Sequence, residues 1–144
     1  MKKPFTAEEF LEIYSKVPRV CVDLVVQHEG KTLLTKRAIP PYKNMYHFPG
    51  GTVFLGESIP DAAKRVAKAE LGIVPVIMRV AGVMELIKDP LGQHAISVVV
   101  LCVTDNLSIT LNNEANDFAF FREIPSKIIK EHGDFLREHN LCKT

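Results

Sequence analysis

The segment from Phe48 to Ile73, FPGGTVFLGESIPDAAKRVAKAELGI, restricts the possible folds of this chain more than any other part of the sequence. Its two adjacent glycines, Gly50 and Gly51, let a backbone approach a ligand closely. Ser58 then suits the N-cap of a helix, and Gly72 suits the position just after a helix C-terminus. The segment therefore predicts a ligand-binding loop followed directly by a helix.

Strand-like and helix-like segments are mixed along the rest of the chain. The predicted helices cover Thr6 to Tyr14, Ser58 to about Leu71, and Lys127 to His139 with Ser126 as its N-cap; the predicted strands cover Arg19 to His28, Lys31 to Arg37, Tyr46 to Phe54 (a short strand and a turn), Pro75 to Leu86, Ala95 to Thr104 and Asp117 to Phe121. The strand from Ala95 is almost entirely apolar, which is typical of a central strand that is buried on both faces. This mixture predicts an α+β fold or a layered α/β sandwich.

Length, charge and cysteine content narrow the class of protein. A chain of 144 residues is expected to form a single domain. Its net charge of +1, without a basic stripe, argues against nucleic acid or a membrane surface as a partner. The longest apolar stretch, Ala95 to Val103, is too short to span a membrane. The three cysteines fit neither a zinc pattern nor a disulfide framework, so we expect a cytoplasmic protein.

One acidic residue stands out in the helix that follows the glycines. The positions that share its face are Ala62, Val66, Ala69, Glu70 and Ile73. In one interpretation, Glu70 lies at the edge of a core-facing stripe and extends its carboxylate to water. In the other, Glu70 faces a site and holds a cation close to the two glycines. The sequence alone leaves both interpretations open.

The spacing of several residues in this segment resembles the Nudix box, Gly-x5-Glu-x7-Arg-Glu-U-x-Glu-Glu-x-Gly-U, where U is a bulky aliphatic residue. The matching positions are Gly51, Glu57, Arg65, Glu70, Gly72 and Ile73. The preceding strand hairpin, the FPGG entry, the central strand and the FFREIP segment are also similar to this family. The resemblance implies one Nudix domain over residues 1–144, with a mixed β-sheet sandwiched between α-helices. It also implies structural roles for Gly51, Glu57, Arg65 and Gly72.

Three positions depart from the box, and Ala67 stands where the box has a bulky aliphatic residue. Val66 and Ala69 stand where the family has glutamates that bind divalent metals. Each lost carboxylate removes charge and an oxygen ligand from a hard cation, so fewer metal ions are expected. Attack of a metal-bound water on phosphorus is then in doubt.

The GDP-mannose mannosyl hydrolase branch of the family also lacks these two glutamates, and the chain is most similar to this branch. The resemblance implies a nucleotide-sugar-like substrate, cleavage of the sugar carbon–oxygen bond, one Mg²⁺ (or Mn²⁺) and a possible homodimer. When water attacks the sugar carbon, the water need not be bound to a metal, and the metal only has to neutralise the departing diphosphate. The implied metal ligands are the Gly50 carbonyl, Glu70 and Glu114, which stands where the branch has glutamine.

Further residues have roles implied by the same resemblance. Arg37 would contact the diphosphate, although it could also be a surface arginine that pairs with an acid. Asp23, on an otherwise apolar strand face, would bind the sugar. Tyr46 would stack on the base, for which His47 is a weaker candidate.

The general base is missing from its expected place. The branch uses a histidine where this chain has Ala115, and an arginine where this chain has Thr52. Glu114 could be the base instead of a metal ligand, and Asp117 and His94 are further substitutes. Arg37, Glu70 and Glu114 are thus the expected catalytic residues of a nucleoside diphosphate-sugar hydrolase. The alternative is a catalytically silent Nudix-fold module that binds a nucleotide or metabolite.

Overall fold

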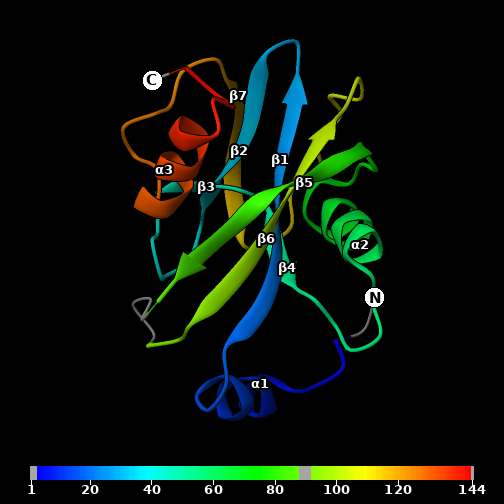
Figure 1. The fold of residues 1–144 in the computed structure, drawn as a ribbon, viewed down its shortest axis with the longest axis vertical. Helices are drawn as coiled ribbons and strands as arrows, with labels where there is room; N and C mark the ends of the chain where they lie inside the picture. The colour runs from blue at the N-terminus through cyan, green and yellow to red at the C-terminus, as the bar shows by residue number, and fades with distance from the viewer. Residues whose placement is uncertain (1–2, 88–91, 144) are drawn as a thin grey trace.

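A mixed β-sheet runs through the middle of the molecule, with helices on both faces (Figure 1). The structure is a computed structural model, and it describes residues 3–87 and 92–143. The strands are β1 Arg19–His28, β2 Lys31–Arg37, β3 Tyr46–His47, β4 Gly50–Thr52, β5 Val76–Leu86, β6 Ala95–Val103 and β7 Ala115–Phe121; the helices are α1 Ala7–Tyr14, α2 Ile59–Leu71 and α3 Lys130–Glu138. Within those residues, the helices are too short and too polar to cross a membrane.

The strand β6 lies at the centre of the sheet, as its apolar sequence predicts. It pairs in parallel with β1 along nine positions, from Arg19 opposite Ala95 to Gln27 opposite Val103. On its other side it pairs with β5 in the antiparallel direction. The strand order is β3-β2-β1-β6-β5, and β7 pairs with the other side of β2.

The hairpin strands β1 and β2 separate after a short paired stretch. They pair only near their turn, where positions 26–28 face positions 33–31. Beyond that point β4 pairs with β1, and β3 pairs with β2. The single short strand expected from Tyr46 is therefore wrong, because two strands form with Phe48 and Pro49 between them. This separation places Gly50 directly opposite Asp23 on β1.

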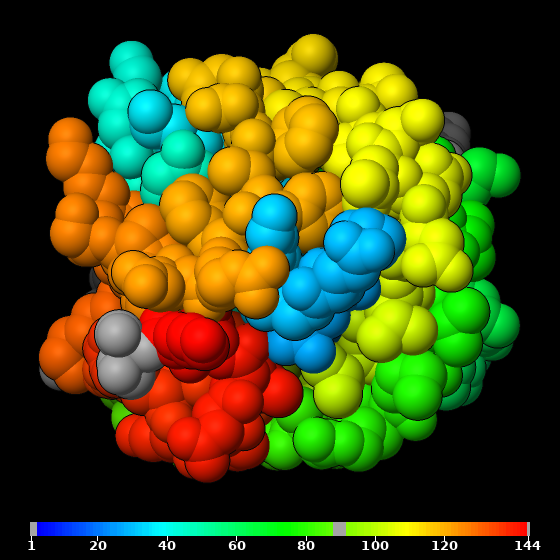
Figure 2. Space-filling view, turned by 90° about the horizontal axis from the view of Figure 1, so that it is seen from above, coloured from blue at the N-terminus to red at the C-terminus, as the bar shows by residue number. Residues whose placement is uncertain are grey.

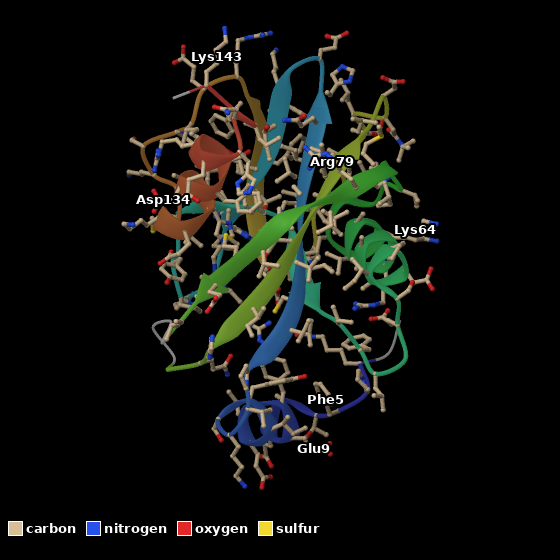
Figure 3. The ribbon with its side chains drawn as sticks, viewed as in Figure 1. Phe5, Glu9, Lys64, Arg79, Asp134 and Lys143 are labelled. Atoms are coloured by element: carbon tan, nitrogen blue, oxygen red, sulfur yellow. The ribbon has the colours of Figure 1, made fainter. Side chains whose placement is uncertain are left out.

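Alternate residues of β1 belong to two different cores. One core packs β1 against α2 and contains Val22, Leu24, Val26, Ala62, Ala63, Val66, Ala67 and Leu71 among others. The other core packs the opposite face against α3 and contains Val25, Leu34, Phe48, Val99, Phe135 and Leu136. Figure 3 shows Lys64 on α2 and Asp134 on α3 on opposite sides of the sheet. The predicted α+β architecture is confirmed.

The ends of α2 form as the sequence predicts, whereas α3 starts later. Ser58 accepts a hydrogen bond from the Asp61 N–H at 3.2 Å, and Gly72 ends α2 in the left-handed conformation with φ 69°. The predicted start of the last helix at Lys127, with Ser126 as N-cap, is wrong. Residues 127–129 are extended because their backbone pairs with Tyr46, through bonds of 2.7 and 3.0 Å.

Figure 2 shows the end of the molecule that carries the β1–β2 turn. The turn lies between the segment that follows β6 and the C-terminal residues. The side chain of Gln27 bonds the Leu141 carbonyl at 2.8 Å, which fixes the C-terminal segment to this end. The glycine pair and the last turn of α2 lie further along the sheet, where β1 pairs with β4.

Candidate active site

Glu70 occupies the last turn of α2 and faces several charged or polar groups from other elements. Its side chain is half-buried. Burial, and then the negative charges of Glu114 and Asp23, raise the pKa of Glu70 to about 8. The Arg37 guanidinium and a hydrogen bond from the Gly50 N–H act in the opposite direction. The structure thus brings together five of the residues that the sequence singled out.

Gly50 packs so closely against β1 that only glycine fits there. A Cβ atom at this position would overlap the Asp23 carboxylate and would lie 2.9 Å from the Val22 carbonyl oxygen. The Gly50 N–H donates to Glu70, and the assignment of the Gly50 carbonyl as a metal ligand stays a prediction. The close approach keeps the Asp23 carboxylate beside the loop.

Asp23 carries its own hydrogen-bond partner. The Ser97 hydroxyl on β6 donates to the Asp23 carboxylate. Burial raises the pKa of Asp23 to about 6, while the Ser97 bond and the Arg19 charge lower it. A carboxylate in this setting can accept a hydrogen bond from a ligand hydroxyl.

Arg37 and Glu114 are neighbours through the backbone. The Ala38 N–H donates to the Glu114 carbonyl at 2.9 Å, and Arg37 lies opposite Ala115 in the β2–β7 pair. The Arg37 Nε donates to the Pro41 carbonyl, which leaves other guanidinium N–H groups for a ligand. The Glu114 side chain is exposed, so it approaches Glu70 from the solvent side.

Glu57 and Arg65 form a two-pronged salt bridge at the other end of the Nudix-like segment. The Arg65 Nε donates to Glu57 Oε2 at 2.7 Å, and its Nη2 donates to Glu57 Oε1 at 3.0 Å. The same Nη2 donates to the Thr52 carbonyl at 2.7 Å, and Glu57 Oε1 accepts from the Phe54 N–H. Arg65 lowers the pKa of Glu57. These bonds connect the segment after the glycines to α2.

The two apolar substitutions lie in different surroundings. Val66 is buried, and a Cβ on Gly51 would lie 3.1 Å from its Cγ2 atom, so the pair packs tightly. Ala69 is exposed, so it does not belong to the buried face of the helix on which the sequence pattern placed it. Neither side chain offers an oxygen to a cation.

Four other candidates have different neighbours in the structure. Tyr46 packs its ring against Phe121, with centroids 4.9 Å apart. Both ring nitrogens of His47 are hydrogen-bonded inside the protein. Asp117 accepts from the Phe118 N–H, and His94 lies 3.7 Å from Glu85. The contacts described for Tyr46, Asp117 and His94 do not extend to Glu70.

The donor set fits one hard cation with few protein ligands. Within residues 3–87 and 92–143, groups of three His, Cys, Asp or Glu side chains placed to hold a metal are absent. Glu70 and Glu114 are nevertheless close enough for Glu114 to raise the pKa of Glu70. A divalent cation would offset this repulsion, because carboxylate oxygens are the ligands that Mg²⁺ and Mn²⁺ prefer.

Sequence reasoning missed two contributors to the site. Ser97 is the only hydroxyl-bearing residue in the apolar run of β6, which was a signal that it has a polar partner. Arg19 donates to the Thr52 hydroxyl at 3.2 Å and lies over the Phe10 ring at 5.4 Å, a contact that no local pattern shows.

Comparison with known proteins places the chain in one family. The NUDIX domain model matches residues 17–137. The chain is 30% identical over 125 residues to an ADP-ribose pyrophosphatase of Methanocaldococcus jannaschii, which covers 85% of this chain and 73% of the relative. It is 43% identical over 82 residues to the low-salt glycan biosynthesis protein Agl8 of Haloferax volcanii, which covers 57% of this chain and 53% of Agl8, so it spans about half of that relative.

Solved structures share the fold. A MutT NUDIX hydrolase from Burkholderia pseudomallei superposes with a TM-score of 0.76 at 23% identity, covering 84% of this chain and 97% of that one. A bifunctional NMN adenylyltransferase/ADP ribose pyrophosphatase from Francisella tularensis, complexed with AMP and a Mn ion, gives a TM-score of 0.66 at 21% identity, covering 91% of this chain and 46% of that one. With a family match over most of its length and this fold, the chain belongs to the Nudix hydrolase family.

Proposed function

We propose that the chain hydrolyses a nucleoside diphosphate linked to a sugar or a similar group, with one divalent cation, Mg²⁺ or Mn²⁺, at Glu70. The observation that carries this proposal is the half-buried Glu70 carboxylate grouped with Glu114, Asp23, Arg37 and the Gly50 N–H. Such a group combines a site for a cation with an arginine for a phosphate oxygen.

The names of the relatives support the substrate class. ADP-ribose, in the name of the Methanocaldococcus relative, is itself a nucleoside diphosphate joined to a sugar. The name of the Haloferax relative refers to glycan biosynthesis. Both names point to sugar chemistry.

Each residue of the group has a proposed part in the reaction. Glu70, Glu114 and the Gly50 carbonyl hold the cation, and Arg37 binds the diphosphate. Asp23, kept in place by Ser97, accepts a hydrogen bond from a sugar hydroxyl. A bound cation supplies positive charge that stabilises the departing diphosphate.

The apolar residues at 66 and 69 determine which bond breaks. With Val66 buried and Ala69 exposed, neither position can hold or activate a water beside phosphorus. We therefore expect water to attack the sugar carbon, so that the carbon–oxygen bond breaks and the electron pair leaves with the nucleoside diphosphate. Because Ala115 offers no proton acceptor, turnover should be slow, by about 100- to 10,000-fold relative to a site with a placed base.

Hydrolysis in ¹⁸O-labelled water tests the proposal. A panel of nucleotide sugars and ADP-ribose is first screened with Mn²⁺ by thermal shift, and the hits are then assayed for turnover. Label in the sugar together with a nucleoside diphosphate product supports attack at carbon, and label in a phosphate contradicts it. Free sugar incubated in labelled water controls for exchange at the anomeric carbon. Binding without turnover would favour the silent binding module.

The proposal also includes a single domain over residues 1–144, a cytoplasmic location and a homodimer. The buried free thiols of Cys21 and Cys102 support a reducing compartment. The strand β5 is the last in the strand order β3-β2-β1-β6-β5 and exposes Val76, Met78 and Val80 by more than half, which supports association of two copies. Light scattering after size-exclusion chromatography tests the dimer.

A further inference from the structure

Phe48 lies in the gap where β1 and β2 separate, and its two backbone polar groups are bonded by imidazoles. The Phe48 N–H donates to His132 Nδ1 at 2.9 Å. The Phe48 carbonyl lies 2.6 Å from His47 Nδ1. A carbonyl oxygen accepts hydrogen bonds only, so His47 carries its proton on Nδ1, whereas His132 Nδ1 must be unprotonated.

The His132 ring is buried, and the His47 ring is half-buried. His132, from α3, is 5% exposed and stacks on the Phe48 ring, with centroids 4.6 Å apart and an interplanar angle of 20°. The Nε2 atom of His47 lies 3.2 Å from the Thr35 hydroxyl on β2. The two imidazole centroids are 6.3 Å apart. The histidines therefore connect β2 and α3 to one residue of the segment between β3 and β4.

We infer that His132 and His47 are positioning residues that hold the Phe48 backbone and thereby place Gly50 against Asp23 and Glu70. This inference rests on the proposed function for its effect on the cation, while the hydrogen bonds themselves can be tested independently. The flanking strands β3 and β4 pair with β2 and β1, whereas Phe48 and Pro49 between them lie outside these pairs. Pro49 has no N–H, and its carbonyl accepts from Leu24 at 2.8 Å.

Small movements of this segment matter because Gly50 has no spare room. The place of a Cβ atom on Gly50 is already taken by the Asp23 carboxylate. A rotation of the peptide that leads into Gly50 would therefore change both the contact with Asp23 and the N–H bond to Glu70. Phe48 lies between the β3–β2 pair and the β4–β1 pair, and the two imidazoles bond the backbone groups of this residue.

Burial, helped by neighbouring positive charge, keeps the two histidines neutral. Burial and then the Arg37 charge lower the pKa of His47 to about 4. Burial, and then His47 and Arg37, lower the pKa of His132 well below its usual value. The two rings also face one another, so a proton on one opposes a proton on the other. Neutral rings are the form that both bonds to Phe48 require.

Three variants of the full chain separate positioning from packing. His132→Phe keeps a ring on Phe48 but removes the acceptor, and His132→Asn restores an acceptor oxygen near the place of Nδ1. Leu136→Ala is the matched control, because it opens the same core from the same helix without touching the Phe48 N–H. All are compared at a temperature where each is folded.

The first measurement is the hydrogen exchange of the Phe48 amide. We expect exchange to be about tenfold faster in His132→Phe, and to recover in part in His132→Asn. The second measurement is the affinity for Mn²⁺ by calorimetry. It should fall several-fold in His132→Phe, recover in part in His132→Asn and remain unchanged in Leu136→Ala.

The inference is overturned if Phe48 exchange is unchanged in His132→Phe, or if Leu136→Ala weakens Mn²⁺ binding as much. If the wild type binds no Mn²⁺, the proposed function fails, and the exchange of Phe48 still decides whether the histidines hold it. Should His132→Phe not fold, ¹⁵N spectra of the wild-type imidazoles decide. They must show an Nε2–H form for His132 and an Nδ1–H form for His47, and the reverse assignment overturns the inference.

Discussion

Two glutamates near opposite ends of α2 show how differently the same side chain can be treated by one fold. Glu57, just before the helix, has a bidentate arginine partner and a backbone N–H, and its pKa is lowered. Glu70, in the last turn, is half-buried with two other carboxylates nearby, and its pKa is raised to about 8. The first carboxylate is satisfied by the protein alone. At the second, burial and like charges outweigh Arg37 and the Gly50 N–H, so a cation or a proton stabilises it.

This difference separates a structural site from a functional one. A satisfied ion pair makes the folded state more stable and leaves little to offer a ligand. A carboxylate held among like charges lowers stability, which is typical of sites that are completed by binding. The comparison can be tested from both sides.

Removal of Arg65 should have the largest effect on stability. Arg65→Ala leaves the Glu57 carboxylate, 14% exposed, and the Thr52 carbonyl without their partner. We expect the free energy of unfolding to fall by about 3 kcal/mol, measured by urea denaturation. Arg137→Ala, which breaks a more exposed pair with Asp134, is the control and should cost less than about 1 kcal/mol. If both variants lose the same free energy of unfolding, the Glu57–Arg65 pair stabilises the fold no more than an exposed ion pair does.

Replacement of Glu70 should chiefly affect the cation. Glu70→Gln keeps the shape of the side chain but removes the carboxylate that faces Glu114 and Asp23. We expect affinity for Mn²⁺ to fall by at least about tenfold, or about 1.4 kcal/mol, in a calorimetric titration. Glu12→Gln, a change at an exposed glutamate on α1, should have no effect. Unchanged binding in Glu70→Gln would place the cation elsewhere.

The same variant should be more stable than the wild type without metal, in a pH-dependent way. Because the folded pKa of Glu70 is raised, ionisation of Glu70 opposes folding. The advantage of Glu70→Gln should be absent near pH 4, grow between about pH 5 and pH 8, and then level off at about 1–2 kcal/mol. The contribution of Glu57 has the opposite sign. Because its pKa is lowered in the folded state, its ionisation stabilises the fold at pH values above the pKa of the unfolded state, and this contribution is lost in acid. Thermal melts across pH in the presence of a chelator measure both. A lack of pH dependence in the difference between wild type and Glu70→Gln would show that Glu70 is not destabilised.

The sequence predicted much of the structural site around Glu57 and less of the candidate functional site around Glu70. The helix caps at Ser58 and Gly72 are local, and the box spacing pairs Glu57, just before α2, with Arg65 on α2. The partners of Asp23 depend instead on which strands lie side by side, and the split between β3 and β4 depends on β1 and β2 moving apart. Long-range pairing of this kind is not visible in a local pattern. The late start of α3 has the same cause, since β3 holds the segment before it in an extended form.

The smallest effect should come from the exposed carboxylate of the group. Glu114 lies in solvent, so its charge acts on Glu70 and on a cation through water, which weakens it. Glu114→Gln should lower Mn²⁺ affinity by about two- to threefold and should shift the midpoint of the Glu70 stability transition to lower pH, because one of the two carboxylates that raise the pKa of Glu70 is gone. Glu123→Gln, another exposed glutamate near β7, is the matched control and should change neither quantity. A loss of affinity in Glu114→Gln as large as that in Glu70→Gln would break the comparison, since the main ligand would then lie on the segment before β7 and not on α2.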